Sequence, residues 1–256
     1  MDLIFLILST LVFLGGFVFS VTTLRSGKYH PGYTNLILIG VGFLFQCGFL
    51  YLRGQLHGRC PITDGAEVLV FIAWSLAIMY FGLGRAFRLS LVGAFTEPIL
   101  VILHLAALIL NLANPVVARP LDSMDPWLEM HAAMSLLAYG AFALAAISGV
   151  MFLIQNRQLK SGSPGKLSFN LPPIQYLTDA LVRLVGIGLL LLTIGVVSAF
   201  FMDKAPSRLH LSVSGGVWFL YLAVLSYHLI KRPPAKWLSI ASLIAFAFAL
   251  LTLSVI

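Results

Sequence analysis

The sequence predicts an all-α membrane protein, a polytopic bundle of about eight transmembrane helices with both termini on the outer side. Hydrophobic residues make up 60% of the chain and charged residues only 10%, and the mean hydropathy is +0.99. Apolar runs long enough to span a bilayer recur along the chain, and Lys and Arg gather in alternate loops. These observations decide the fold class, the number of crossings and the orientation.

The composition excludes a water-soluble domain, because about a quarter of the residues are charged in a typical soluble chain. A hydrocarbon core about 30 Å thick needs roughly 20 apolar residues per helix. The 256 residues therefore hold about eight crossings and little else, and we expect residues 1–256 to form a single transmembrane domain. Apolar runs of this length do not alternate with the period of a strand, so no sheet is expected.

Polar residues, Gly and Pro separate the apolar runs and set the limits of each expected helix. The fifth loop, near residues 155–180, is the only one long enough to hold structure of its own. The expected helices cover residues 3–24, 33–52, 66–84, 96–114, 128–154, 180–202, 210–230 and 236–256.

The distribution of basic residues predicts the orientation of the bundle. Eleven of the 16 Lys and Arg residues fall in or beside the first, third, fifth and seventh loops. Cytoplasmic loops carry the excess of positive charge in membrane proteins, so these four loops are expected inside. The second, fourth and sixth loops and both termini are then outside, which is an N-out/C-out topology.

Composition and motifs also exclude several classes of function. The net charge of +7 lies in topology-setting loops rather than in a basic patch with aromatic residues, so no nucleic-acid partner is expected. The sequence has no HExxH, CxxC or CxxCH motif, no Gly-rich phosphate loop and no serine nucleophile motif, so an enzyme is not expected. Cys47 and Cys60 are too few for a disulfide framework. The partner that the composition does predict is the lipid bilayer.

Histidines are the candidate ligands, and the expected topology sorts them. His131 stands at the outer end of the fifth helix and His210 at the outer end of the seventh. His228 lies near the inner end of the seventh helix, and His104 lies within the fourth, roughly 12 Å from its inner end. Because imidazole is a usual axial ligand of haem iron, the allowed pairs are His131 with His210, or His104 with His228.

Other ionisable residues have simpler interpretations. An ionisable group inside a bilayer commonly marks a functional site, but a neutral imidazole bonded to a neighbouring helix explains His104 equally well. His30 and His57 fall in loops, where we expect solvated side chains. Glu67 and Glu97 begin the third and fourth expected helices, and both fit helix caps better than proton carriers.

Two long segments resemble one family of membrane proteins. The first is PWLEMHAAMSLLAYGAFALAAISGVMFLIQNRQLK, residues 126–160. The second is LVRLVGIGLLLLTIGVVSAFF, residues 181–201, followed by VWFLYLAVLSYH, residues 217–228. Their order and spacing resemble the cytochrome c assembly protein family, the CcsA/CcmC superfamily of haem-handling membrane proteins. The resemblance covers about residues 58–256, and the FNLPPI segment at 169–174 is most similar to the HemX-like branch of small inner-membrane proteins.

The resemblance implies roles for two histidines. The histidine of the family's WLxxH pattern is an outer-face haem ligand, and His131 holds that position. A histidine that closes the helix after the outer loop is a membrane-embedded haem ligand in relatives, and His228 holds that position. His104 and His210 are candidates from topology alone. Haem-exporting members have a tryptophan-rich outer loop, whereas MDKAPSRLH at residues 202–210 contains no tryptophan.

The leading hypothesis is a non-enzymatic haem-handling or accessory protein of cytochrome c biogenesis that lacks the haem-presenting loop. The expected location is a bacterial inner (plasma) membrane, with cytochrome c assembly or haem-biosynthesis proteins as partners. The alternative is a cofactor-free membrane regulator or scaffold that affects haem biosynthesis, at the level of glutamyl-tRNA reductase, through its cytoplasmic loops. A solute transporter would predict inverted repeats, and the two halves of the sequence show no such symmetry.

Overall fold

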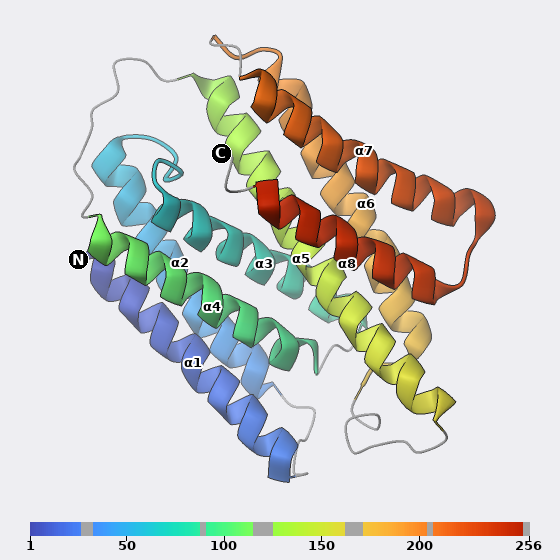
Figure 1. Ribbon diagram of the computed structural model, residues 1–256. Helices are drawn as coiled ribbons and strands as arrows, with labels where there is room; N and C mark the ends of the chain where they lie inside the picture. The colour runs from blue at the N-terminus through green and yellow to red at the C-terminus, as the bar shows by residue number, and fades with distance from the viewer. Residues whose placement is uncertain (27–32, 88–90, 115–124, 162–170, 204–206, 253–256) are drawn as a thin grey trace. The chain divides into compact units, whose positions relative to one another are not determined.

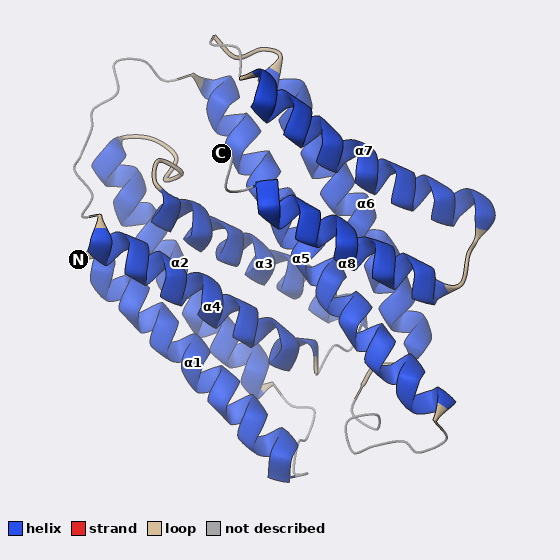
Figure 2. Cartoon of the chain, viewed as in Figure 1, coloured by secondary structure: helices blue, strands red, loops and turns tan. Residues whose placement is uncertain are grey.

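The computed structural model describes residues 1–26, 33–87, 91–114, 125–161, 171–203 and 207–252. Within these ranges the chain consists of helices and turns and has no strand (Figure 2). Eight helices follow one another along this part of the chain (Figure 1). They are α1 (Asp2–Ser26), α2 (Thr34–His57), α3 (Gly65–Phe87), α4 (Val92–Ala113), α5 (Pro126–Lys160), α6 (Ile174–Ala199), α7 (Arg208–Lys231) and α8 (Ala235–Thr252).

The lengths of the helices confirm a polytopic membrane bundle. Seven of the described helices are long and apolar enough to cross a membrane. α8 has 18 residues up to Thr252, and the end of the last expected span lies outside the described residues. The protein is therefore a multi-pass, all-α membrane protein, while the N-out/C-out orientation stays a prediction.

The described helices group into two compact units, which we call unit 1 (Met1–Met124) and unit 2 (Asp125–Ile256). In unit 1, α1 packs against α2 and α4, and α3 packs against α2 and α4. In unit 2, α5 packs most extensively against α6 and also against α8, while α7 contacts α6 and α8. The single-domain assignment of residues 1–256 stays a prediction.

Local signals explain where several helices begin and end. Asp125 caps α5, because its Oδ1 accepts hydrogen bonds from the backbone N–H groups of Trp127 at 2.9 Å and Leu128 at 3.4 Å. α2 ends at Gly58, whose φ of 65° is a left-handed conformation that glycine adopts at little cost. α7 ends at Arg232, which has a φ of 46° and precedes two prolines that cannot continue a helix.

Four expected helix limits differ from the structure by at least four residues. α2 continues to His57 rather than ending near residue 52, and α6 begins at Ile174 rather than near residue 180. α4 begins at Val92 rather than near residue 96, because the preceding residues are apolar and continue the helix. Glu97 consequently lies inside α4 with its side chain fully buried, and the expectation that it caps the helix is wrong. α5 continues to Lys160 rather than ending near residue 154, since its last turns are built from good helix formers.

A stacked aromatic pair marks the core of unit 2. The rings of Phe142 on α5 and Tyr221 on α7 lie 3.6 Å apart between centroids with an angle of 5° between their planes. Gly188 on α6 faces Phe142, and a Cβ at that position would overlap the ring. This close approach holds α5, α6 and α7 together below the site described next.

Candidate functional site

Two of the four candidate histidines are in direct contact at one end of unit 2. Nε2 of His131 lies 3.1 Å from Nε2 of His210, and the ring planes meet at 62°. His131 is in the second turn of α5 and His210 in the first turn of α7, so the pair joins the beginnings of two helices. The structure therefore brings together the outer pair that the topology allowed. Their role as haem ligands stays a prediction.

A backbone carbonyl fixes the orientation of His131. Nδ1–H of His131 donates a hydrogen bond to the carbonyl oxygen of Gly195 on α6 at 2.7 Å. The same oxygen accepts a hydrogen bond from the Ser198 hydroxyl at 2.8 Å. With its proton on Nδ1, the buried imidazole presents the lone pair of Nε2 towards His210. Metal-binding histidines are commonly held in this way, with the second nitrogen bonded to a carbonyl or carboxylate.

Gly195 has a second role at this site, because it lets α6 approach α5 closely. A Cβ at Gly195 would lie 2.6 Å from Oγ of Ser135 and 3.3 Å from the carbonyl oxygen of His131. Any side chain would push the two helices apart and lengthen the bond from His131 to the Gly195 carbonyl. The sequence gives no signal for this role, since Gly195 is one of 22 glycines in an apolar chain.

His210 is held less firmly than His131. The Ser207 hydroxyl caps α7 by accepting a hydrogen bond from the backbone N–H of His210 at 3.1 Å. Among the described residues, the His210 ring contacts His131, and no second hydrogen bond to the ring is seen there. Metal–imidazole bonds are about 2 Å long, so one metal bound by both nitrogens requires the rings to separate by about 1 Å. The pair fits iron in the chemistry of its donors, and His131 is the more firmly held of the two.

The connection between α6 and α7 is tied to the start of α5. Oδ2 of Asp125 accepts a hydrogen bond from the backbone N–H of Asp203 at 2.9 Å, while its Oδ1 caps α5. The backbone N–H of Asp203 stabilises the ionised form of Asp125 most, followed by those of Trp127 and Leu128. Together they hold the pKa of Asp125 below its usual value. Asp125 thus ties the start of α5, which carries His131, to the residues that follow α6.

Apolar side chains lie at the same end of unit 2 as the histidine pair. The rings of Trp127 and Phe201 lie 4.9 Å apart between centroids, next to the ends of α5 and α6. Phe200, Phe201 and Leu209 are 74%, 58% and 60% exposed, which leaves a large apolar surface at this end of unit 2. The described part of the sixth loop has no tryptophan, so its aromatic character comes from α5 and from the end of α6.

His228 and His104 lie in different surroundings. Nδ1 of His228, near the end of α7, is buried and has no hydrogen-bond partner among the described residues. In unit 1, Nδ1–H of His104 donates to the carbonyl oxygen of Leu100 at 2.9 Å, and the Gln46 amide donates to its Nε2 at 3.2 Å. Both nitrogens of His104 are therefore occupied, as expected for a structural imidazole. The pairing of His104 with His228 stays a prediction.

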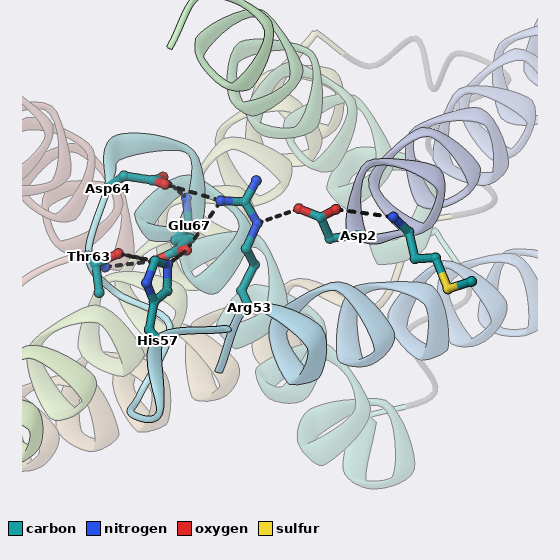
Figure 3. Close-up of polar contacts among 7 residues, drawn as sticks. Asp2, Arg53, His57, Thr63, Asp64 and Glu67 are labelled. Atoms are coloured by element: carbon teal, nitrogen blue, oxygen red, sulfur yellow. Dashed lines mark hydrogen bonds and ion pairs between the residues drawn. The ribbon is translucent and has the colours of Figure 1, made fainter. Parts of the chain in front are cut away.

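A buried ion cluster, which the sequence analysis missed, lies in unit 1 (Figure 3). The Arg53 side chain is only 2% exposed, and its Nε lies 2.7 Å from Oδ2 of Asp2. One of its terminal nitrogens lies 3.4 Å from Asp64 and 3.5 Å from Glu67. Nε2 of His57 is 2.9 Å from Glu67, so the expectation of a solvated His57 is wrong.

The sequence does carry a signal for part of this cluster. Oδ1 of Asp64 accepts a hydrogen bond from the backbone N–H of Glu67 at 2.9 Å, and Glu67 accepts one from the backbone N–H of Thr63 at 2.8 Å. This reciprocal arrangement at the start of α3 confirms that Glu67 acts in a helix cap. An arginine at the end of an apolar run, followed by an acidic cap, was the observation that could have predicted the cluster.

Comparison with known proteins points to one family. The family model described as "Cytochrome C assembly protein" matches residues 63–255. Protein HemX from Bacillus subtilis (strain 168) is 24% identical over 204 residues, which cover 76% of this chain and 71% of HemX. The cytochrome c biogenesis protein CcsA from Chlamydomonas reinhardtii is 26% identical over 173 residues, which cover 63% of this chain.

The matched relatives differ in length. A CcsA from Picosynechococcus sp. is 30% identical over 158 residues, which cover 58% of this chain. The matched segment spans only 46% of this CcsA and 46% of the one from Chlamydomonas reinhardtii. The chain therefore corresponds to less than half of these two proteins, and to a larger part of HemX.

Proposed function

This chain belongs to the cytochrome c assembly protein family, and we propose that it is a non-enzymatic haem-handling protein of cytochrome c biogenesis. The site that we propose is the His131–His210 pair. The observation that supports it best is the contact at 3.1 Å between two imidazole nitrogens that are 79 residues apart in the chain. The proposed location is a bacterial inner membrane, with cytochrome c assembly proteins as partners.

The two histidines have different tasks in this proposal. His131 is the fixed ligand, because the Gly195 carbonyl holds its Nδ1–H and directs Nε2 outward. His210 is the exchangeable ligand, because in the described part of the chain it is held by the His131 contact and the cap of α7 alone. Bound haem would supply an iron that accepts neutral imidazoles as ligands, and His131 and His210 would hold it. When no haem is bound, Nε2 of His131 and Nε2 of His210 are hydrogen-bonded to each other.

The apolar side chains at the same end of unit 2 supply the remaining binding energy in this proposal. Burial of apolar surface yields about 25 cal/mol per Å², and Trp127, Phe200 and Phe201 expose large aromatic faces there. A planar apolar macrocycle suits such a surface better than a hydrated ion does. His228, whose Nδ1 lacks a partner among the described residues, is the second candidate site that the family resemblance implies.

The alternative, a cofactor-free regulator that acts through its cytoplasmic loops, depends on the fifth loop. Residues 162–170 of that loop lie outside the described residues, so this alternative stays a prediction.

The test is a haemin titration of the detergent-purified protein, followed by absorbance in the Soret region. We expect a saturable shift for the unmodified chain and its loss in His131→Ala. In His210→Ala we expect weaker binding with an altered spectrum, because one axial ligand remains. His57→Gln is the matched control, since His57 belongs to the ion cluster of unit 1 and should leave the titration unchanged.

Two outcomes would contradict the proposed site. A chain that shows no saturable shift while remaining folded does not handle haem in this way. If His228→Ala abolishes the shift and both His131→Ala and His210→Ala retain it, haem is bound near the end of α7 instead of at the histidine pair.

A further inference from the structure

A second polar site is buried inside unit 1, away from the ion cluster. The Glu97 carboxyl on α4 is fully buried and accepts a hydrogen bond from the Ser20 hydroxyl on α1, with 2.6 Å between Oγ and Oε2. The Asn35 amide on α2 donates both to Oγ of Ser20 at 2.6 Å and to Oε2 of Glu97 at 3.2 Å. One residue from each of three helices therefore meets at this carboxyl group.

The hydrogen bonds leave one carboxyl oxygen free. The single hydroxyl proton of Ser20 goes to Glu97, so Ser20 can only accept from Asn35, and both donors end on Oε2. Oε1 of Glu97 is buried and has no partner among the described residues. A proton can therefore bind to and leave Oε1 without breaking either hydrogen bond. Gly16 makes room for this oxygen, because a Cβ there would lie 2.5 Å from Oε1.

The surroundings of Glu97 favour a proton as its ligand. The groups that face Glu97 are neutral: they are Ser20 from α1 and Asn35 from α2. The Tyr80 hydroxyl of α3, which lies close to Asn35 and Gly93, is neutral as well. No described Lys, Arg or His pairs with it, and the described residues contain no cluster of metal-binding side chains. An isolated carboxylate inside a bilayer is costly, and taking up a proton removes that cost.

Further buried polar groups continue from Glu97 along α4. Glu97, His104 and Asn111 are spaced by seven residues, about 10 Å per step, on one face of the helix, and their side chains are 0%, 0% and 9% exposed. Oε1 of Gln46, beside His104, and Nδ2 of Asn111 have no hydrogen-bond partner among the described residues. Buried polar atoms without protein partners are the usual positions of internal water.

The ion cluster of unit 1 lies at the far end of this row. A Cβ placed on Gly65 would lie 3.3 Å from the Leu110 side chain. The end of α4 is therefore beside the start of α3, where Glu67 lies. Glu67 shares a hydrogen bond with His57 at 2.9 Å, so the row ends at a hydrogen-bonded pair of ionisable side chains (Figure 3). Asp2 and Asp64 in the same cluster are 32% and 30% exposed, so the cluster reaches solvent.

From this arrangement we infer that unit 1 conducts protons along a row that runs from Glu97, past the structural imidazole of His104, by way of Gln46 and Asn111 to the Glu67–His57 pair. Glu97 is the buried proton-binding group, and the free amide and carboxyl atoms along α4 hold the water that bridges the steps. The residues of this row belong to unit 1, and the inference does not depend on haem binding in unit 2.

Proton flux into liposomes tests this inference. The full chain is reconstituted into vesicles that contain a trapped pH-sensitive dye, and a potassium gradient with valinomycin sets the membrane potential. We expect faster acidification than in protein-free vesicles, and a fall to the protein-free rate in Glu97→Gln, which keeps an acceptor for Ser20 but cannot ionise. Thr96→Val is the matched control, because the hydrogen bond that the Thr96 hydroxyl makes among the described residues is to the Val92 carbonyl of its own helix.

Equal rates in vesicles with and without the protein would overturn the inference, and so would equal rates in the unmodified chain and Glu97→Gln. If Glu97→Gln does not fold, infrared spectroscopy of the unmodified chain decides. We then expect the carbonyl band of a protonated carboxylic acid that titrates with pH, exchanges in heavy water and shifts in Glu97→Asp. A chain without such a band has no proton-binding carboxyl group in this row.

Discussion

Phe142 and Tyr221 stack with 3.6 Å between ring centroids, yet the Tyr221 hydroxyl at the edge of this stack has no hydrogen-bond partner among the described residues. A buried polar group without a partner costs roughly 1–3 kcal/mol. The ring of Tyr221 therefore stabilises unit 2, while its unpaired hydroxyl destabilises it.

Tyr221→Phe is accordingly expected to raise the free energy of unfolding by about 1 kcal/mol, because it keeps the stack and removes the unpaired hydroxyl. The measurement is thermal unfolding of the detergent-purified protein. Tyr139→Phe is the matched control, since the Tyr139 hydroxyl donates to the Ala249 carbonyl at 3.0 Å. An interhelical hydrogen bond in a membrane protein contributes about 0.6 kcal/mol on average, so this control should lose stability. Destabilisation by Tyr221→Phe would mean that the hydroxyl has a partner such as water.

Gly195→Ala should separate α5 from α6 and weaken both stability and haem binding. The new Cβ would meet Oγ of Ser135 at 2.6 Å, and overpacking of this kind costs about 1–3 kcal/mol. The same helix offers Gly186→Ala as a control, because nothing lies within 4 Å of a Cβ there. That change should stabilise α6 by up to about 1 kcal/mol through helix propensity. Equal behaviour of the two variants would show that α5 and α6 are not closely packed at Gly195.

Arg53→Met should be strongly destabilising, because it leaves Asp2, Asp64 and Glu67 without their shared cation. Removing one partner of a buried ion pair typically costs about 3–5 kcal/mol. Unfolding by heat in detergent measures the loss. His57→Gln keeps a donor for Glu67 and should cost far less. A small effect of Arg53→Met would mean that the carboxylates take up protons when the arginine is absent.

Asp125 is expected to make unit 2 less stable in acid. Backbone N–H donors lower the pKa of Asp125 in the folded protein, so its contribution is fully present above the pKa of the unfolded chain. The contribution is lost as the pH falls through the lower pKa of the folded state. Asp125→Asn should therefore lower the melting temperature near neutral pH and reduce its decline in acid. A melting curve whose pH dependence is the same in both proteins would contradict this assignment.

The sequence predicted the fold class and one histidine pair because both depend on patterns that act over whole helices. Apolar runs of bilayer length predict the helices, and the basic loops place the starts of the fifth and seventh helices on one side. His131 and His210 follow from these two facts, and their contact at 3.1 Å agrees with that placement. The resemblance around residues 126–160 is likewise confirmed by the family match.

The errors arose where tertiary contacts override a local signal. Pro98 after Glu97 resembled a helix start, but the apolar residues from Val92 onward already form the first turn of α4. His57 lies in a polar stretch, yet its ring is paired with Glu67 of the next helix. The hydrogen-bond partners of Glu97 and of His57 come from other helices, so the residues next to them in the sequence do not show that these side chains are paired.

The bond between His131 and the Gly195 carbonyl has a further consequence for experiments. Its acceptor belongs to the main chain, so side-chain replacement can strain this bond but cannot remove its acceptor, and an alanine scan would assign no polar role to α6 here. Replacing the amide that follows Gly195 with an ester, by semisynthesis, would weaken the carbonyl as an acceptor and leave every side chain unchanged. The chemistry of the imidazole at His131 is thus set in part by a peptide group that genetic substitution does not reach.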